Sequence, residues 1–129
     1  MKFSFSDKLV KTKSFIELCN TVQYYAFDGV EISDVDAEIS VHTDSIFRPS
    51  VTADAKRKLV NRHISIPAIV FPEIVDKNTD STKIVKYVEY AALASVNGVV
   101  IKFEDLPAED ELKKVLTPAI TVARHPLYA

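Results

Sequence analysis

Five charged or titratable side chains in this sequence could act on a small substrate. Four of them, Glu31, Glu73, Lys102 and Glu104, lie at or near the ends of short runs rich in Val, Ile and Phe, and the fifth, His42, lies in a polar stretch. A carboxylate can move a proton, and an ammonium group can hold a hydroxyl or phosphate oxygen. Glu31, Lys102 and Glu104 are therefore candidates for catalysis, and Glu73 and His42 for substrate binding, although a charged residue at a strand end is more often solvated or paired.

The polar stretch that contains His42 also offers Asp34, Asp36 and Glu38 as oxygen ligands. Hard divalent cations favour oxygen donors, so a metal loop is one interpretation of this segment. The spacing of these residues matches no metal-binding loop, however, and the simpler interpretation is that their side chains are solvated. We therefore predict no metal site in the chain, and we expect residues 34–50 to form a long polar connection.

A repeated pattern indicates which elements hold these residues in place. Asp28 and Gly29 precede the run Val-Glu-Ile, and Asn97 and Gly98 precede the run Val-Val-Ile 69 residues later. The two glycines are the only ones in the protein, and each follows an apolar stripe with helical spacing. Glycine enters the left-handed conformation without a steric penalty, so both glycines are expected to end a helix in that conformation.

Strands and helices are expected to alternate along the whole chain. The first helix begins at the capping box from Ser14 to Glu17, and its apolar stripe includes Cys19 and Tyr25. Pro67 counts against the third strand because proline has no amide hydrogen, and Pro118 is expected to bend the last helix. The expected strands are residues 2–6, 29–33, 64–71 and 99–103, and the expected helices begin near residues 14, 52, 81 and 107.

Four such units in 129 residues amount to roughly 32 residues each, which is the unit size of an eight-unit TIM barrel. The sequence therefore predicts an α/β fold, a (βα)4 half of a TIM barrel that forms a single domain over residues 1–129. Right-handed connections give a parallel four-stranded sheet in the order 1-2-3-4, with the helices on its outer face. The first and fourth strands would be open edges, and the inner face of the sheet would be bare.

The chain resembles the N-terminal half of the xylose isomerase-like TIM barrels, the group of sugar-phosphate isomerases and epimerases that also includes the type IV apurinic endonucleases. The matching patterns are collinear and lie at residues 27–32 (Phe-Asp-Gly-Val-Glu-Ile), 63–68, 87–94, 97–99, 106–107 and 116–123. Members similar to the isomerases hold a divalent metal with carboxylates and a histidine on strands five to eight, which have no counterpart here. The resemblance therefore implies a fragment or truncated form of a (βα)8 barrel.

Two functions follow from this resemblance. The first is the N-terminal portion of a sugar isomerase- or epimerase-like barrel, which acts on a small sugar or sugar phosphate in the full-length protein. The isolated chain would then be inactive and hold no cofactor, because the divalent metal belongs to the full-length barrel. The second is a non-enzymatic half-barrel module that forms a homo-oligomer, or docks on a partner, through its open face or edges. A flavodoxin-like arrangement is a minor alternative, and the absence of a phosphate-cradling glycine loop counts against it.

Composition narrows the classes of partner. The net charge is −2 and the 16 Lys and Arg residues are scattered, so nucleic-acid binding is not expected. The sequence has no run of about 18 apolar residues, and residues 1–6 are too short and polar for a signal sequence, so we expect no membrane association and a cytoplasmic location. The single cysteine, Cys19, has no disulfide partner in the chain and is expected to pack in the core.

Overall fold

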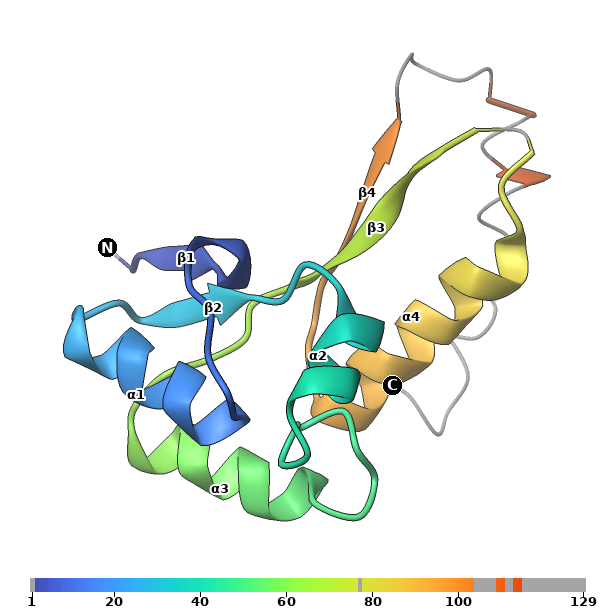
Figure 1. Ribbon diagram of the computed structural model, residues 1–129. Helices are drawn as coiled ribbons and strands as arrows, with labels where there is room; N and C mark the ends of the chain where they lie inside the picture. The colour runs from blue at the N-terminus through green and yellow to red at the C-terminus, as the bar shows by residue number, and fades with distance from the viewer. Residues whose placement is uncertain (1, 77, 104–108, 111–112, 115–129) are drawn as a thin grey trace.

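Short parallel strands alternate with helices, and the helices lie on one side of the strands (Figure 1). The computed structural model describes residues 2–76, 78–103, 109–110 and 113–114. The site candidate Glu104 lies outside these residues, as does most of the helix expected from Pro107 onward, including Pro118, which was expected to bend it near Lys114. The elements are β1 (Ser4–Ser6), the short 3-10 helix η1 (Asp7–Leu9), α1 (Phe15–Tyr24), β2 (Gly29–Glu31), α2 (Val35–Val41), α3 (Thr52–Asn61), β3 (Ile69–Val75), α4 (Ser81–Ala94) and β4 (Val99–Phe103).

The strands follow one another in space in the order of the sequence. β1 pairs in parallel with β2, and β3 pairs in parallel with β4. Two isolated parallel bridges, from Gly29 to Ser65 and from Ile32 to Ile69, join the two pairs. The predicted parallel order 1-2-3-4 is therefore confirmed, although the contact between the second and third strands is much shorter than a full ladder.

The third strand lies further along the chain than the sequence predicts. Residues 64–71 were expected to form it, whereas β3 starts at Ile69 and continues to Val75, with a single bridge at Ser65 before it. Pro67 explains the late start because its nitrogen has no hydrogen to donate to a neighbouring strand. The register of β3 against β4 shifts between Val70 and Ile74. Pro72 lies within this shift, where it does not have to donate a ladder hydrogen bond.

The start of α1 agrees with the predicted capping box. Ser14 Oγ accepts a hydrogen bond from Glu17 N at 3.1 Å, and Glu17 Oε2 accepts one from Lys13 N at 3.0 Å. Its buried stripe includes Cys19, as predicted. The stripe ends earlier than expected, because the helix stops at Tyr24 and leaves Tyr25 60% exposed.

The expected role of the two glycines is wrong. Neither glycine has a positive φ, and the described residues that do are Ala26 (59°), His63 (55°) and Ser95 (57°). Each of the three follows a helix, and the next amide donates to the carbonyl five residues earlier, at 3.1, 3.2 and 2.8 Å. These bonds satisfy carbonyls at the helix ends, as in the Schellman motif, so non-glycine residues make the left-handed turns.

The glycines instead allow strands to approach one another. A Cβ atom on Gly29 would lie 2.7 Å from the carbonyl oxygen of Ser65 and 2.9 Å from Ser4 Oγ. A Cβ atom on Gly98 would lie 3.2 Å from the carbonyl oxygen of Pro67. Glycine is thus required at position 29 by the close contact between β2 and the segment before β3.

Residues 34–50 were expected to form a long polar connection, and this connection contains a short helix, α2. Asp34 caps this helix by accepting a hydrogen bond from Ala37 N at 3.1 Å. Val35 at the start of the helix is buried, and so are Ile46 and Phe47 after it. The segment is therefore part of the core. None of the described helices is long and apolar enough to cross a lipid bilayer.

Candidate functional site

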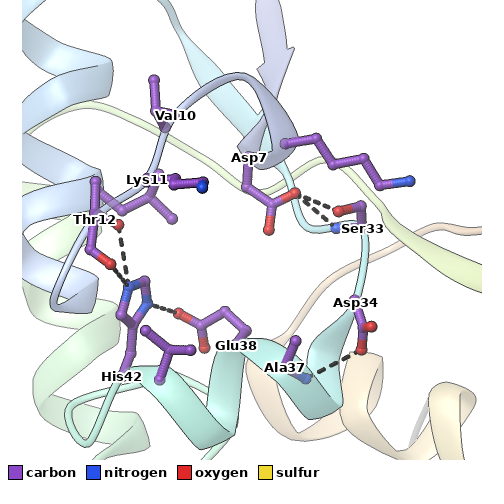
Figure 2. Close-up of a pocket in the computed structure, with 12 residues that line it drawn as sticks. Asp7, Val10, Lys11, Thr12, Ser33, Asp34, Ala37, Glu38 and His42 are labelled. Carbon is purple, nitrogen blue, oxygen red and sulfur yellow. Dashed lines mark hydrogen bonds and ion pairs between the residues drawn. The ribbon is translucent and has the colours of Figure 1, made fainter.

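A cavity of about 440 Å³ lies at the carboxyl ends of β1 and β2 (Figure 2). Its walls come from residues 7–12 after β1, residues 33–42 after β2, and Leu18 of α1. The volume is within the range of small-molecule sites, and the carboxyl ends of the strands form the functional face of TIM barrels. This cavity is therefore the candidate site.

A buried pair of ionisable residues forms one wall of the cavity. Glu38 and His42 stand one turn apart at the end of α2 and are 5% and 6% exposed. Nδ1 of His42 is hydrogen-bonded to Glu38 Oε1, and Ser45 Oγ donates to the other carboxylate oxygen. Nε2 of His42 lies 3.1 Å from Thr12 Oγ1 and 3.0 Å from the Thr12 carbonyl oxygen. The ring thus links α2 to the segment between β1 and α1.

The environment of this pair changes the proton affinity of both members. Burial raises the pKa of Glu38 to about 7, although the hydrogen bond from His42 acts against this rise. Burial by itself would lower the pKa of His42, but its hydrogen bonds to Glu38 and Thr12 outweigh this effect and raise the pKa above its ordinary value. Each member of the pair therefore holds a proton more strongly than its free side chain does, as is common for groups that transfer protons in active sites.

The opposite wall carries a second carboxylate, Asp7. Its Oδ1 accepts hydrogen bonds from Ser33 N at 3.0 Å and from Ser33 Oγ at 2.6 Å. This contact joins the ends of β1 and β2. Figure 2 shows the other oxygen of Asp7 turned toward the centre of the cavity, where it can accept a hydrogen bond from a ligand. Lys8 and Lys11 also line the cavity and bring positive charge to it.

The structure places one of the five predicted site residues in this cavity, namely His42. Glu31 ends β2 and is half-buried, and Lys102 is exposed in β4. Glu73 lies inside β3 instead of at a strand end, and its carboxylate binds Lys83 Nζ at 3.0 Å. Neither Glu31, Glu73 nor Lys102 lines the cavity, and Glu104 is outside the described residues.

The interpretation of Glu38 and His42 as solvated residues is wrong. It rested on the spacing of these residues, which matches no metal-binding loop. In the helix α2 the same spacing puts both side chains on one face, the face that also carries the buried Val35. The sequence did contain a signal for the start of this helix, because Asp34 is a favourable N-cap residue, and it accepts a hydrogen bond from the amide of Ala37.

The described part of the chain contains no group of three or more His, Cys, Asp or Glu residues placed to hold a metal ion. Asp7 and Glu38 are on opposite walls of the cavity, and each is already bound by serine. The donor set therefore does not fit the divalent metal that the resemblance implies for a full barrel.

Comparisons with known proteins agree with this architecture. No family model and no curated protein matches the sequence. Among solved structures, 3-keto-D-glucoside 4-epimerase YcjR from E. coli matches with a TM-score of 0.60 at 13% identity, over 95% of this chain and 52% of that one. A xylose isomerase domain protein from Alicyclobacillus acidocaldarius matches with a TM-score of 0.61 at 12% identity, over 96% of this chain and 46% of that one.

The chain spans about half the length of both matched structures, which are TIM-barrel proteins, so its βα units correspond to half of such a barrel. Within that class, the chain has the xylose isomerase-like fold. The resemblance predicted from the sequence is confirmed at the level of the fold.

Proposed function

We propose that this chain is the N-terminal half of a sugar isomerase- or epimerase-like barrel and forms part of its substrate-binding site. The observation that supports the proposal is the cavity at the carboxyl ends of β1 and β2, in a fold that matches half of an epimerase and half of a xylose isomerase domain protein. Asp7 and Thr12 offer hydrogen-bonding groups for sugar hydroxyls, and Lys8 and Lys11 offer positive charge for a phosphate.

The isolated chain is proposed to bind without catalysing isomerisation. The resemblance assigns a divalent metal to later strands of a full barrel, and the described residues provide no matching ligand cluster. Glu31 and Lys102 remain proposed contacts to substrate in the full barrel, because Glu31 ends β2 and Lys102 lies one residue before the end of β4. Without the second half of the barrel, these groups lack the partners that would complete a reaction centre.

A titration with a ketose phosphate tests this proposal. Fructose 6-phosphate, added to ¹⁵N-labelled protein, is expected to shift the amide signals of Lys8, Thr12 and Ser33, and Asp7→Asn is expected to weaken this binding. Glu73→Gln, which lies outside the cavity, is the matched control and should leave the binding unchanged. The proposal is wrong if these signals do not move, or if the isolated chain turns over ketoses together with stoichiometric Mg²⁺ or Mn²⁺.

A second candidate function is a half-barrel module that associates with another copy of itself. Val100 is 38% exposed and Ile74 is 60% exposed, and both lie on the face of β3 and β4 that the helices do not cover. Pairing of two such faces would bury these apolar side chains and give the open strand edges a partner.

Sedimentation measurements test the homo-oligomer. A dimer or larger assembly is expected for the wild type, and Val100→Lys is expected to dissociate it because the substitution puts a charge in the contact. Val60→Lys changes an equally apolar residue, 70% exposed on α3, and should leave the assembly intact. A wild-type monomer at high concentration contradicts this candidate.

A cytoplasmic location is also part of the proposal. Its support is the single cysteine, which has no disulfide partner within the chain and is buried in the structure. Reducing compartments are the usual setting for proteins without disulfides. Imaging of a tagged chain in its own cell type is the direct test, and export of the protein would contradict the assignment.

A further inference from the structure

Three residues at the edge of the cavity form a carboxylate, imidazole and hydroxyl series. Glu38 Oε1 binds Nδ1 of His42, and Nε2 of the same ring lies 3.1 Å from Thr12 Oγ1. Figure 2 shows the three side chains in line, with Thr12 and His42 on the segment and helix that enclose the cavity. The same order of groups activates hydroxyl nucleophiles on unrelated folds, where it is recognised by geometry.

The protonation of the series follows from its contacts. With one proton on Nδ1, donated to Glu38, the neutral ring presents a lone pair at Nε2 and accepts the hydrogen bond of the Thr12 hydroxyl. When Nε2 is also protonated, it donates to the Thr12 carbonyl oxygen, which lies 3.0 Å away. The ring therefore has a partner within reach of Nε2 in both states, and it can take the hydroxyl proton without losing its position.

The carboxylate holds the imidazole in the orientation that this transfer needs. Glu38 is buried, and Ser45 Oγ donates to the carboxylate oxygen that His42 does not bind. Arg48 Nε donates to the carbonyl oxygen of His42 at 3.1 Å and fixes the backbone of the histidine from the other side. The ring is thus held before any ligand binds.

We propose that Thr12 is a nucleophile activated by His42 and Glu38, and that the cavity carries out acyl transfer from small esters. This activity does not depend on the sugar chemistry proposed above, because it uses residues that are all within the chain. Lys8 and Lys11 line the same cavity, and an ammonium group there can stabilise the negative oxygen that develops when an ester is attacked.

The reaction balances with water as the second substrate. Thr12 Oγ1 attacks the ester carbonyl carbon, its proton passes to His42 Nε2, and the bond to the leaving alcohol breaks as the alcohol takes that proton. Thr12 then carries the acyl group as an ester. Water attacks this ester, gives its proton to His42 Nε2, and releases the carboxylic acid while the proton returns to Thr12 Oγ1.

Mass spectrometry after exposure to p-nitrophenyl acetate tests the proposal. The wild type is expected to gain an acetyl group on Thr12 that hydroxylamine removes, because esters are labile to hydroxylamine and acetylated lysines are not. Thr12→Val removes the hydroxyl and should abolish the labile acetyl group. Thr21→Val is the matched control, because in the described part of the chain the Thr21 hydroxyl donates to the Glu17 carbonyl oxygen and not to an imidazole.

The roles of Glu38 and His42 in this series are tested by the rate of acetylation. Glu38→Gln and His42→Gln are expected to slow acetylation of Thr12 by about 100-fold, the size of a general-base effect. In the wild type, the rate should rise with pH through the titration of His42 and then level off. The charged groups around the pair, which shape this profile, are Asp7, Asp44, the guanidinium of Arg48, and Lys8 and Lys11 in the cavity lining.

Each alternative result overturns the proposal. Acetylation confined to lysines, with no labile acetyl group on Thr12, shows that the hydroxyl is not activated. If Thr12 is labelled as fast in folded Glu38→Gln and His42→Gln proteins as in the wild type, then Glu38 and His42 do not activate the hydroxyl. If thermal melting shows that both variants are unfolded, the wild-type profile decides, because a rate that simply tracks hydroxide up to pH 9 rules out an imidazole base.

Discussion

Replacement of Gly29 by alanine gives the sharpest test of the fold. The new Cβ would lie 2.7 Å from the carbonyl oxygen of Ser65, a distance that carbon and oxygen do not tolerate without movement. Ser65 cannot simply turn away, because its carbonyl accepts from Val30 N and its amide donates to the Asp28 carbonyl, both at 3.0 Å. The substitution therefore strains two of the backbone hydrogen bonds that join β2 and the residue before it to the segment before β3.

The magnitude follows from these contacts. Overpacking of a tight site reduces stability by about 1–3 kcal/mol, and each weakened backbone hydrogen bond adds about 1 kcal/mol. A loss of about 3 kcal/mol in the free energy of unfolding is expected for Gly29→Ala, or roughly 10 °C in Tm. Gly98→Ala is the matched control, because its nearest contact would be 3.2 Å and a small shift relieves it. Its expected loss is below about 1 kcal/mol.

Urea unfolding followed by circular dichroism measures both variants. Equal losses of about 1–2 kcal/mol would refute the reasoning, because that is the penalty for alanine in a left-handed position and would indicate that both glycines end helices in that conformation. A larger loss for Gly98→Ala than for Gly29→Ala would contradict the strand contact directly.

Three further predictions use the same unfolding assay or a simple reagent. Ala26→Gly should stabilise the protein by about 0.5–1 kcal/mol because φ at Ala26 is 59°. Ala53→Gly, on the exposed side of α3, is the control and should destabilise the protein by about 1 kcal/mol. A loss of stability in both variants contradicts the left-handed turn. Burial alone would raise the pKa of Asp44, but the hydrogen bonds that its carboxylate accepts from the amides of Phe15 and Ile16 outweigh burial and hold the pKa below its usual value. Asp44→Asn should therefore lower the free energy of unfolding by about 1–2 kcal/mol at pH 7, and the variant should match the wild type once the pH falls through that pKa. A difference that does not depend on pH refutes this cap. Burial raises the pKa of Cys19 to about 12, so this thiol should react with Ellman's reagent in urea but scarcely at all in the native state, and fast native labelling would contradict the packing.

The sequence predicted the parallel order of the strands because strands and helices alternate and the connections between parallel strands are right-handed. The capping box at Ser14 and the buried Cys19 were also predictable, since both depend on spacing within one helix. The position of β3 was not predictable from local pattern alone. The bulge that accommodates Pro72 arises from pairing with β4, which local pattern does not encode.

The candidate site was largely invisible in the sequence. His42 was singled out, but its partners Glu38 and Thr12 meet it only because α2 turns both acidic and imidazole side chains inward and the segment after β1 passes beside them. In the sequence, Glu38 interrupts the apolar stripe of α2 and therefore indicates an exposed position instead of a buried one. The burial and the hydrogen bonds that together change the pKa values of the pair arise only when α2 packs beside the segment after β1.

The narrow join between the two strand pairs is expected to be where local opening of the protein occurs first. The pairs meet through a few backbone bonds on either side of Pro67, whereas each pair is held by its own ladder. Amide protons at the join, such as those of Val30 and Val70, should exchange with deuterium sooner than those within α4. The two units that would part in such an opening each contain one copy of the repeat whose copies lie 69 residues apart, so the molecule carries the outline of two quarter-barrels within one chain.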